Sequence, residues 1–376
     1  MKKTFFFLPD DLSTKIFAQT FSEKLRFDVE LHTVAPVYDH DTYLKDVKSI
    51  HHDIPMTRSF SPFLDLLYMM RVLKLLIKHR PETVITFTTK PNILVPIVAK
   101  IAGVSRIIVA VRGLGRFFNK DHSLARTFFL WLYKITAFFS DYIWVSNPID
   151  LDVFTSASIK PRLGFIETSN AISLSEFDKS SVSESEKRNL WQALSLKSGE
   201  KVVILVGRMI ASKGVKDFFQ AAKIIYRDNK LIKFILVAPL EKGTPDAVPE
   251  SYFTDNPPPN FQWLGKRNDI KALYSVSHLS VLPSYYAEGG NPRALLEAMA
   301  FGLPVIAGDT PLCRGPVCNN KNGYLVPVKD PQALADAILK VFSDDDVYQS
   351  MSAYSYERVK REFNDEFVVE KISKYL

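Results

Sequence analysis

One stretch, residues 279–304, constrains the fold of this chain more than any other. Its apolar start, Leu279–Leu282, predicts a buried strand. After a polar, glycine-bearing turn, Asn291 stands where a helix N-cap belongs and Pro292 occupies the first helical position. Good helix formers follow over residues 294–301. The stretch is therefore a strand–loop–helix unit whose free amides and helix dipole favour an anion such as phosphate.

Strands alternate with helices along the chain, which indicates an α/β fold with parallel, doubly wound sheets. With 376 residues, the chain is too long for one ordinary domain. We expect an N-terminal domain over residues 1–170, a Ser-, Glu- and Lys-rich linker over 171–187 and a C-terminal domain over 188–355. Ligands of such sheets bind beyond the carboxyl ends of the strands.

The amino-acid composition limits the classes of molecule that this chain is expected to bind. The net charge of +7 predicts an anionic partner, which leaves nucleic acid, acidic lipid or a phosphorylated ligand open. Nucleic acid fits least, since Lys and Arg are spread along the chain and no nucleic-acid module is recognisable.

The two cysteines, Cys313 and Cys318, suit a reducing compartment. The apolar start of the chain ends at Leu8, too early for a signal peptide, and no run approaches the roughly 18 apolar residues of a membrane span.

The pattern EG..PR.LLEAMA.G.PVIA within residues 288–307 closely resembles the signature of retaining glycosyltransferases of family four. This resemblance implies the GT-B fold, which is two Rossmann-like domains facing a cleft, with a last helix at about 356–376 crossing back onto the first domain. It implies that Glu288 meets the hydroxyls of the donor sugar and that Glu297 holds the ribose of the nucleotide. Eight residues separate the two acids here where the family usually has seven, with Gly290-Asn291 as the insertion.

A second element, Gly207-Arg208 through Lys213-Gly214, resembles the family's GR....KG pattern. The resemblance implies that Arg208 and Lys213 neutralise the donor diphosphate, whose charge grows as the glycosidic bond breaks. We therefore expect Arg208, Lys213 and Glu288 to act in catalysis without a metal or another cofactor. The donor-binding residues implied by the resemblance are Gly207, Gly265, Gly289, Gly290, Asn291, Pro292, Arg293, Leu296 and Glu297.

Two turns in the first half, Thr-Lys-Pro-Asn-Ile at 89–93 and Gly-Leu-Gly at 113–115, follow predicted strands. Together they resemble a branch of family four that builds bacterial surface polysaccharides and related lipid-linked glycans, such as O-antigen or capsule. That branch implies an acceptor carried on polyprenyl diphosphate. The residues we expect to contact the acceptor or its phosphates are Lys90, Arg112, Gly113, Gly115 and Arg116.

Other features support weaker predictions. Asp39-His40-Asp41 matches an Asp-x-Asp metal motif, but a polar surface loop explains it better, and His51-His52 is also better explained as surface than as a ligand pair. Aromatic residues crowd the segment 117–144 among Lys and Arg. A core helix and a helix lying on an anionic bilayer both explain this segment.

These features lead to a hypothesis and two alternatives. The first is a retaining glycosyltransferase that moves a sugar from a UDP-sugar, in α-linkage, to a polyprenyl-diphosphate-linked saccharide. We expect it in the cytoplasm, peripherally bound to the inner face of the membrane. A non-catalytic sugar-nucleotide-binding scaffold is the second, because of the insertion and because Gly315 replaces an acid of the family's Cys-Arg-Glu turn. The third is a glycosyltransferase with a soluble acceptor.

Overall fold

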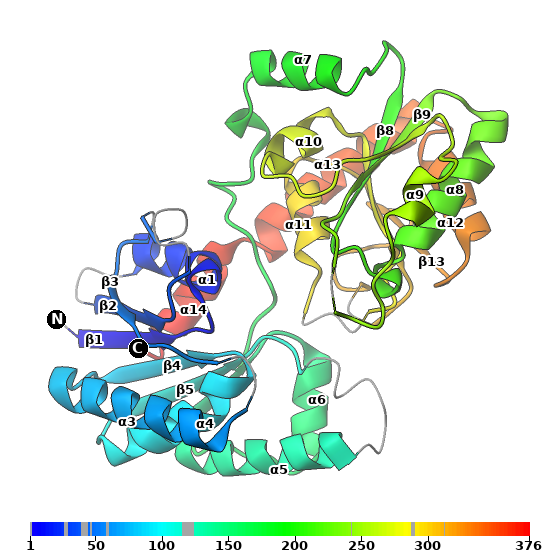
Figure 1. The fold of residues 1–376 in the computed structure, drawn as a ribbon. Helices are drawn as coiled ribbons and strands as arrows, with labels where there is room; N and C mark the ends of the chain where they lie inside the picture. Colours follow the sequence, from blue (N-terminus) through cyan, green and yellow to red (C-terminus); the bar gives the residue numbers. More distant parts are fainter. Residues whose placement is uncertain are drawn as a thin grey trace. The chain divides into compact units, whose positions relative to one another are not determined.

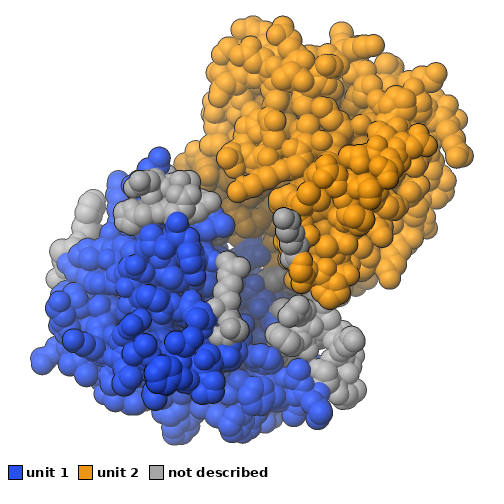
Figure 2. All heavy atoms as spheres, viewed as in Figure 1, with its two compact units in different colours: residues 1–170, 365–376 blue, residues 171–364 orange. Residues whose placement is uncertain are grey.

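The computed structural model describes residues 2–25, 29–38, 44–45, 47–57, 60–114, 124–241, 243–286, 290–311 and 313–376. The chain divides into two compact units (Figure 2). Unit 1 holds residues 1–170 together with 365–376, and unit 2 holds residues 171–364. The segment 171–187, expected as a linker, thus belongs to unit 2.

Unit 1 is built on a seven-stranded parallel sheet in the order β3-β2-β1-β4-β5-β6-β7. Its inner strands β4 and β5 are buried almost throughout, because helices cover both faces of the sheet. The strands are β1 (Lys2–Phe7), β2 (Val29–Ala35), β3 (Ile50–Asp53), β4 (Thr83–Phe87), β5 (Arg106–Val111), β6 (Tyr142–Val145) and β7 (Gly164–Glu167).

Alternate residues of these strands point to opposite faces. Phe6 and Leu8 pack with α1 (Asp11–Lys24) and α14 (Asp365–Ser373), whereas Phe5 and Phe7 pack with α3 (Pro62–His79) and α4 (Thr89–Ile101). Figure 1 shows α3, α4 and α5 (Leu124–Phe139) side by side on one face of the sheet and α1 and α14 on the other. A further helix, α6 (Pro148–Ser156), follows β6.

Unit 2 holds a six-stranded parallel sheet in the order β10-β9-β8-β11-β12-β13. One face packs on α7, α10, α11 and α13, and the other on α8, α9 and α12. The strands are β8 (Lys201–Val206), β9 (Ile232–Val237), β10 (Phe261–Trp263), β11 (Leu279–Leu282), β12 (Val305–Gly308) and β13 (Gly323–Val326). The helices are α7 (Glu184–Ala193), α8 (Val215–Asp228), α9 (Ser251–Thr254), α10 (Ile270–Val276), α11 (Arg293–Ala300), α12 (Pro331–Val341) and α13 (Asp345–Glu362), with short 3₁₀ turns η2 (Lys179–Ser181) and η3 (Ala211–Lys213).

The sequence-based boundaries differ from the structure at several element ends. The sequence predicts a helix over 13–25 with Ser13 as its cap. In the structure Asp10 is the N-cap of α1, and its Oδ1 accepts the Ser13 N–H at 2.8 Å. The strand β3 and the helix α6 were not expected, although Asn147 and Pro148 at the start of α6 carry the ordinary N-cap and first-position signals.

Candidate donor site

The two cations of the GR....KG element lie together at the carboxyl end of the unit 2 sheet. Arg208 follows β8, Lys213 ends the turn η3, and Tyr286 comes from the loop after the neighbouring strand β11. The Tyr286 ring centroid lies 5.0 Å from Arg208 Cζ and 5.2 Å from Lys213 Nζ. Two positive charges therefore converge on one aromatic ring where parallel sheets bind ligands.

Backbone contacts hold the two loops against each other. The Tyr285 N–H and the Ser284 hydroxyl both donate to the carbonyl oxygen of Ser212, at 2.8 and 3.2 Å. Gly214 adopts a left-handed conformation with φ 74°, and a Cβ at this position would lie 2.6 Å from Pro283 Cγ. Glycine is required here because only a residue without a side chain permits both the conformation and the close approach. This packing fixes the loop that carries Lys213.

The guanidinium of Arg208 is only loosely engaged within unit 2. Its Nε lies 4.0 Å from Glu241 Oε1, at the outer limit of an ion pair, and 43% of the side chain is exposed. Such a partner can be exchanged for a ligand phosphate, because an exposed ion pair contributes little, roughly 0–1 kcal/mol.

Glu297 lies inside helix α11 and is mostly buried. Its Oε1 pairs with Arg293 Nε at 3.3 Å, and burial raises the pKa of Glu297 while Arg293 opposes that shift. Beneath it, the Tyr274 hydroxyl donates to the carbonyl oxygen of Ala294 at 3.1 Å, and burial raises the Tyr274 pKa well above its ordinary value. A carboxylate held in this way is a rigid acceptor suited to ligand hydroxyl groups.

The start of α11 differs from the expected one. Pro292, not Asn291, is the N-cap, it makes no side-chain cap hydrogen bond, and the helix begins at Arg293. The Asn291 side chain instead lies against Gly315, where an added Cβ would overlap it. The prediction of an Asn291 cap was therefore wrong, because this side chain packs on a neighbouring loop.

The structure describes most of the other candidate donor-binding residues. Leu296 is part of the buried core of unit 2, Gly265 and Gly290 have φ of 65° and 146°, and a Cβ at Gly207 would make only an ordinary contact with Leu205. Glu288 and Gly289 lie outside the described residues. The Trp263 indole N–H donates to the carbonyl oxygen of Ala238 at 2.9 Å.

In unit 1 the candidate acceptor residues have partners of their own. Lys90 is buried, and its Nζ lies 2.5 Å from Asp65 Oδ1 and 2.8 Å from the carbonyl oxygen of Thr57. The Arg112 guanidinium lies over the rings of Phe17 and Trp144, at 5.3 and 5.0 Å. Gly113 has φ 121°, and Gly115 and Arg116 lie outside the described residues.

A carboxyl group that sequence reasoning missed lies beside this turn. Asp150 is buried in α6, accepts from Asn147 Nδ2 at 2.8 Å and interacts with the backbone N–H of Leu114. Burial raises the pKa of Asp150 to about 6, although both hydrogen bonds act in the opposite direction. The Asn147-Pro148 cap signal would have identified the helix but not this burial.

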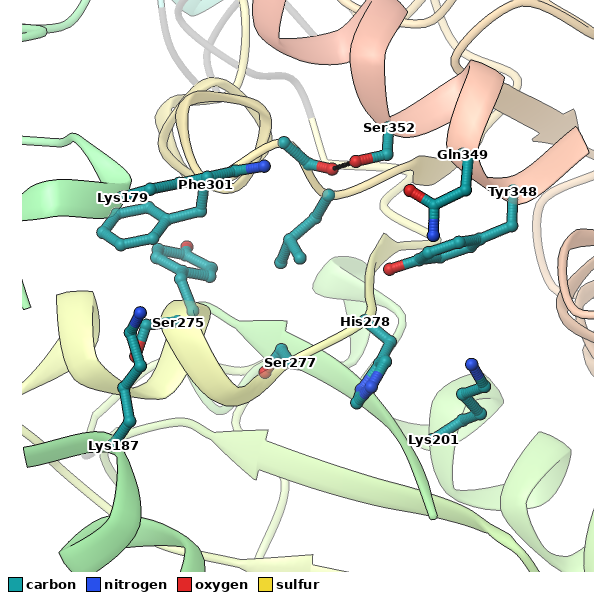
Figure 3. Close-up of a pocket in the computed structure, with 13 residues that line it drawn as sticks. Lys179, Lys187, Lys201, Ser275, Ser277, His278, Phe301, Tyr348, Gln349 and Ser352 are labelled. Atoms are coloured by element: carbon teal, nitrogen blue, oxygen red, sulfur yellow. Dashed lines mark hydrogen bonds between the residues drawn. The ribbon is translucent and has the colours of Figure 1, made fainter. Parts of the chain in front are cut away.

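A separate pocket of about 410 Å³ lies at the other end of the unit 2 sheet (Figure 3). It is lined by Lys201 at the start of β8, by His278 just before β11 and by Tyr348 of α13. The donor loops leave the opposite, carboxyl ends of the same strands. This pocket is therefore not the donor site.

Two family models match the chain. "Glycosyl transferases group 1" matches residues 186–358, and "Glycosyl transferase 4-like" matches residues 8–147. The chain belongs to the family-four, group 1 glycosyltransferases. It is accordingly a glycosyltransferase, and its two parallel-sheet units form the GT-B fold.

Relatives and solved structures agree with this assignment. The chain is 27% identical to the capsular polysaccharide biosynthesis glycosyltransferase CapM of Staphylococcus aureus, over 86% of this chain and 83% of CapM. It is 26% identical to the UDP-Gal:alpha-D-GlcNAc-diphosphoundecaprenol alpha-1,3-galactosyltransferase of Escherichia coli, over 93% and 88% of the two chains. The structure of Anabaena HepE with UDP and glucose has a TM-score of 0.81 at 18% identity, covering 100% of this chain and 99% of that one. The first of these relatives is named for capsular polysaccharide biosynthesis and the second for a sugar linked to diphosphoundecaprenol.

No helix among the described residues has both the length and the apolar character needed to cross a bilayer.

Proposed function

We propose that this glycosyltransferase is a retaining enzyme. It transfers a sugar from a UDP-sugar, in α-linkage, to a saccharide carried on polyprenyl diphosphate during surface polysaccharide biosynthesis. The observation that carries the proposal is the convergence of Arg208 and Lys213 on Tyr286. In unit 2 these cations are borne on loops at the carboxyl end of the sheet, as is the start of the helix that holds Glu297.

The chemistry of the reaction explains this set of residues. The leaving nucleoside diphosphate gains charge as the bond to the sugar breaks, and two fixed cations stabilise that change. Glu297 accepts the ribose hydroxyls and Glu288 meets the sugar. The departing phosphate oxygen takes the proton of the acceptor hydroxyl while that hydroxyl attacks the anomeric carbon from the same side. With two cations on the diphosphate, the step requires no metal.

The relatives support the choice of donor, linkage and acceptor. The Escherichia coli relative is named for UDP-Gal, an alpha-1,3 linkage and a diphosphoundecaprenol acceptor. A Campylobacter jejuni relative, 24% identical over 84% of this chain, is named as an N,N'-diacetylbacillosaminyl-diphospho-undecaprenol alpha-1,3-N-acetylgalactosaminyltransferase. Both names share a diphosphate-linked polyprenol and an α-linkage.

An exposed apolar surface on unit 1 supports an acceptor at the membrane. Large apolar side chains are exposed on α3 and α5, two helices that flank α4 on the same face of the sheet (Figure 1). They include Phe63, Leu66, Met70 and Ile77 of α3 and Leu124, Phe128, Trp131 and Phe138 of α5. Basic residues of the same helices, such as Lys74 and Lys134, suit anionic headgroups. We infer peripheral binding of this surface to the inner leaflet of the cytoplasmic membrane.

The reaction is tested with a panel of labelled UDP-sugars and synthetic polyprenyl-diphosphate saccharides. We expect transfer from one UDP-sugar, an α-linked product by NMR, and turnover that persists in EDTA. A β-linked product contradicts the retaining mechanism. Binding of UDP-sugars without transfer or donor hydrolysis would favour the scaffold alternative.

The membrane surface is tested by cosedimentation with vesicles of phosphatidylethanolamine and phosphatidylglycerol. Phe128→Ala with Trp131→Ala should reduce the bound fraction. Phe367→Ala is the matched control, because Phe367 is also an exposed aromatic residue of unit 1 but belongs to α14 on the opposite face of the sheet. Absence of binding by the wild-type protein, together with transfer to a soluble saccharide, favours the soluble-acceptor alternative.

A further inference from the structure

Three histidines from three different elements of unit 1 meet at one point. His32 lies on β2, His52 on β3, and His79 is the last residue of α3. One ring nitrogen of each lies within 4.8 Å of the others. His32 is buried, and its ring stacks on Phe5 of β1 with centroids 4.3 Å apart. His52, expected as a surface residue, is partly buried in this cluster.

A carboxylate orients the central histidine. Glu30 Oε1 lies 2.5 Å from His32 Nε2, so this nitrogen carries the proton and donates it. The lone pair is thereby placed on His32 Nδ1, which faces His52 Nε2 at 2.9 Å. Metal-binding histidines commonly have this arrangement, with the second ring nitrogen bound to a carboxylate.

The cluster also meets the chemical requirement for metal ligands. Each of the three histidines offers one ring nitrogen to the cluster, and a neutral imidazole nitrogen is a common metal ligand. In a tetrahedral zinc site with Zn–N bonds of about 2.0–2.1 Å, neighbouring nitrogens are roughly 3.3 Å apart. The present spacing is 2.9 Å between His32 Nδ1 and His52 Nε2 and at most 4.8 Å within the cluster, so binding an ion requires the rings to rotate. Lys3 and Lys78 add positive charge nearby, which Glu30 partly offsets.

We propose that His32, His52 and His79 bind a divalent transition metal, with Zn²⁺ as the ion that three imidazoles favour. Glu30 holds His32 in the binding tautomer, and water fills the fourth position. The ion links the outer strands β2 and β3 to the end of α3. Because it joins three elements of unit 1, we expect the ion to stabilise the fold of that unit.

The test uses full-length, tag-free protein treated with EDTA and then titrated with ZnCl₂ by calorimetry and by thermal unfolding. We expect one Zn²⁺ per chain and a rise in melting temperature. His52→Ala and His79→Ala should abolish saturable binding. Glu30→Gln should weaken it by about 10- to 100-fold without abolishing it.

His51→Ala is the matched control. His51 is the neighbour of His52 on β3 but contacts Thr33 Oγ1 at 3.0 Å, on the opposite face of the sheet. It should bind Zn²⁺ as the wild type does. Because an alanine variant can fail to fold, Co²⁺ added to the wild-type protein provides a second readout, and a visible absorption band of tetrahedral nitrogen-ligated cobalt is expected. Saturable Zn²⁺ binding that survives in the His52→Ala/His79→Ala double variant would overturn the proposal, as would the absence of binding and of the cobalt band in the wild type.

Discussion

The two units carry cations at equivalent places in their sheets but use them differently. In unit 2, Arg208 and Lys213 lie over Tyr286, and Arg208 is 43% exposed. In unit 1, the Lys90 side chain is only 6% exposed and pairs with Asp65. Both sets follow a strand at its carboxyl end, where a ligand is expected. Cations at the same place in the topology thus differ in burial and in partners, so topology alone does not assign a cation to a ligand or to the fold.

The physical reason is the cost of desolvation. A buried ammonium group requires a fixed counter-charge, so Lys90 and Asp65 depend on each other for burial. A partly exposed cation over an aromatic ring remains hydrated on one side, and an incoming diphosphate can pair with it. Under the proposed function, Arg208 and Lys213 of unit 2 pair with the donor diphosphate, whereas Lys90 of unit 1 pairs with Asp65 within its own fold.

The largest effect that this comparison predicts is on stability. Lys90→Ala leaves Asp65 buried without its counter-charge, so the free energy of unfolding should fall by about 3–5 kcal/mol. Urea unfolding measures the loss. The matched variant Lys90→Met with Asp65→Leu should recover most of it, because it removes both charges.

Unchanged stability of Lys90→Ala would contradict a structural role for Lys90. If Lys90→Ala unfolds like the wild type but raises the KM for the lipid-linked acceptor, Lys90 contacts the acceptor as the family resemblance implies. The contrast between the units then disappears.

The next largest effect is on turnover. Lys213→Ala removes a cation that stabilises the leaving diphosphate, so kcat should fall by about 10²- to 10³-fold, as for other groups that stabilise transition-state charge. The melting temperature should change little, because the side chain is partly exposed. Transfer assays with the labelled donor measure it. Lys216→Ala is the control. Lys216 of α8 lies over the ring of Tyr252 of α9, so this variant should retain wild-type kcat. Equal activities of wild type and Lys213→Ala would contradict the proposed role.

A third prediction concerns Asp150, the buried acid of unit 1. Its pKa is about 6 in the folded state and near 3.8 when unfolded, so the folded state binds more protons between these pH values. The contribution of Asp150 to stability is therefore complete below about pH 4 and is lost as pH rises through 6. The loss amounts to about 3 kcal/mol, since each pKa unit corresponds to about 1.36 kcal/mol.

Asp150→Asn cannot ionise and lacks this pH dependence. Urea unfolding of the two proteins should show the variant gaining stability relative to the wild type from pH 4 to 7 and then remaining level. A constant difference across that range would mean that the hydrogen bonds from Asn147 and Leu114 keep the carboxylate ionised despite its burial.

Much of the fold was predictable from local patterns. The sequence predicts a helix over 62–79 and a strand over 83–88. The helix is confirmed with the same ends in α3 and the strand in β4, because each pattern lies within one element. The strand β3 was missed because its four residues, Ile-His-His-Asp, have no strand signature and are placed by pairing with β2. Contacts between elements, unlike periodicity, leave no trace in a single sequence.

The same limit applies to the candidate site. Motif resemblance located Arg208 and Lys213, but no spacing rule identifies Tyr286 as the ring between them or Asp65 as the partner of Lys90. The histidine cluster could not be predicted either. His32, His52 and His79 are far apart in the sequence and come together only when β2, β3 and α3 pack.

The smallest predicted effect concerns the two departures of the donor segment from its family, the extra residue beside Asn291 and the glycine at 315. These two positions lie against each other in the structure. The Asn291 side chain fills the space that a Cβ at Gly315 would need. Arg358 holds this loop by donating to the carbonyl oxygens of Gly315 and Pro316 at 2.7 and 2.9 Å, so Asn291 must give way. Gly315→Ala should therefore cost about 1–3 kcal/mol, as overpacking does. It should also weaken the thermal shift caused by UDP, since Asn291 immediately precedes the cap of α11.

Asn291→Gly opens the same space, and the double variant should recover most of the stability that Gly315→Ala loses. Additive effects in this double-mutant cycle would show that Asn291 and Gly315 do not interact energetically.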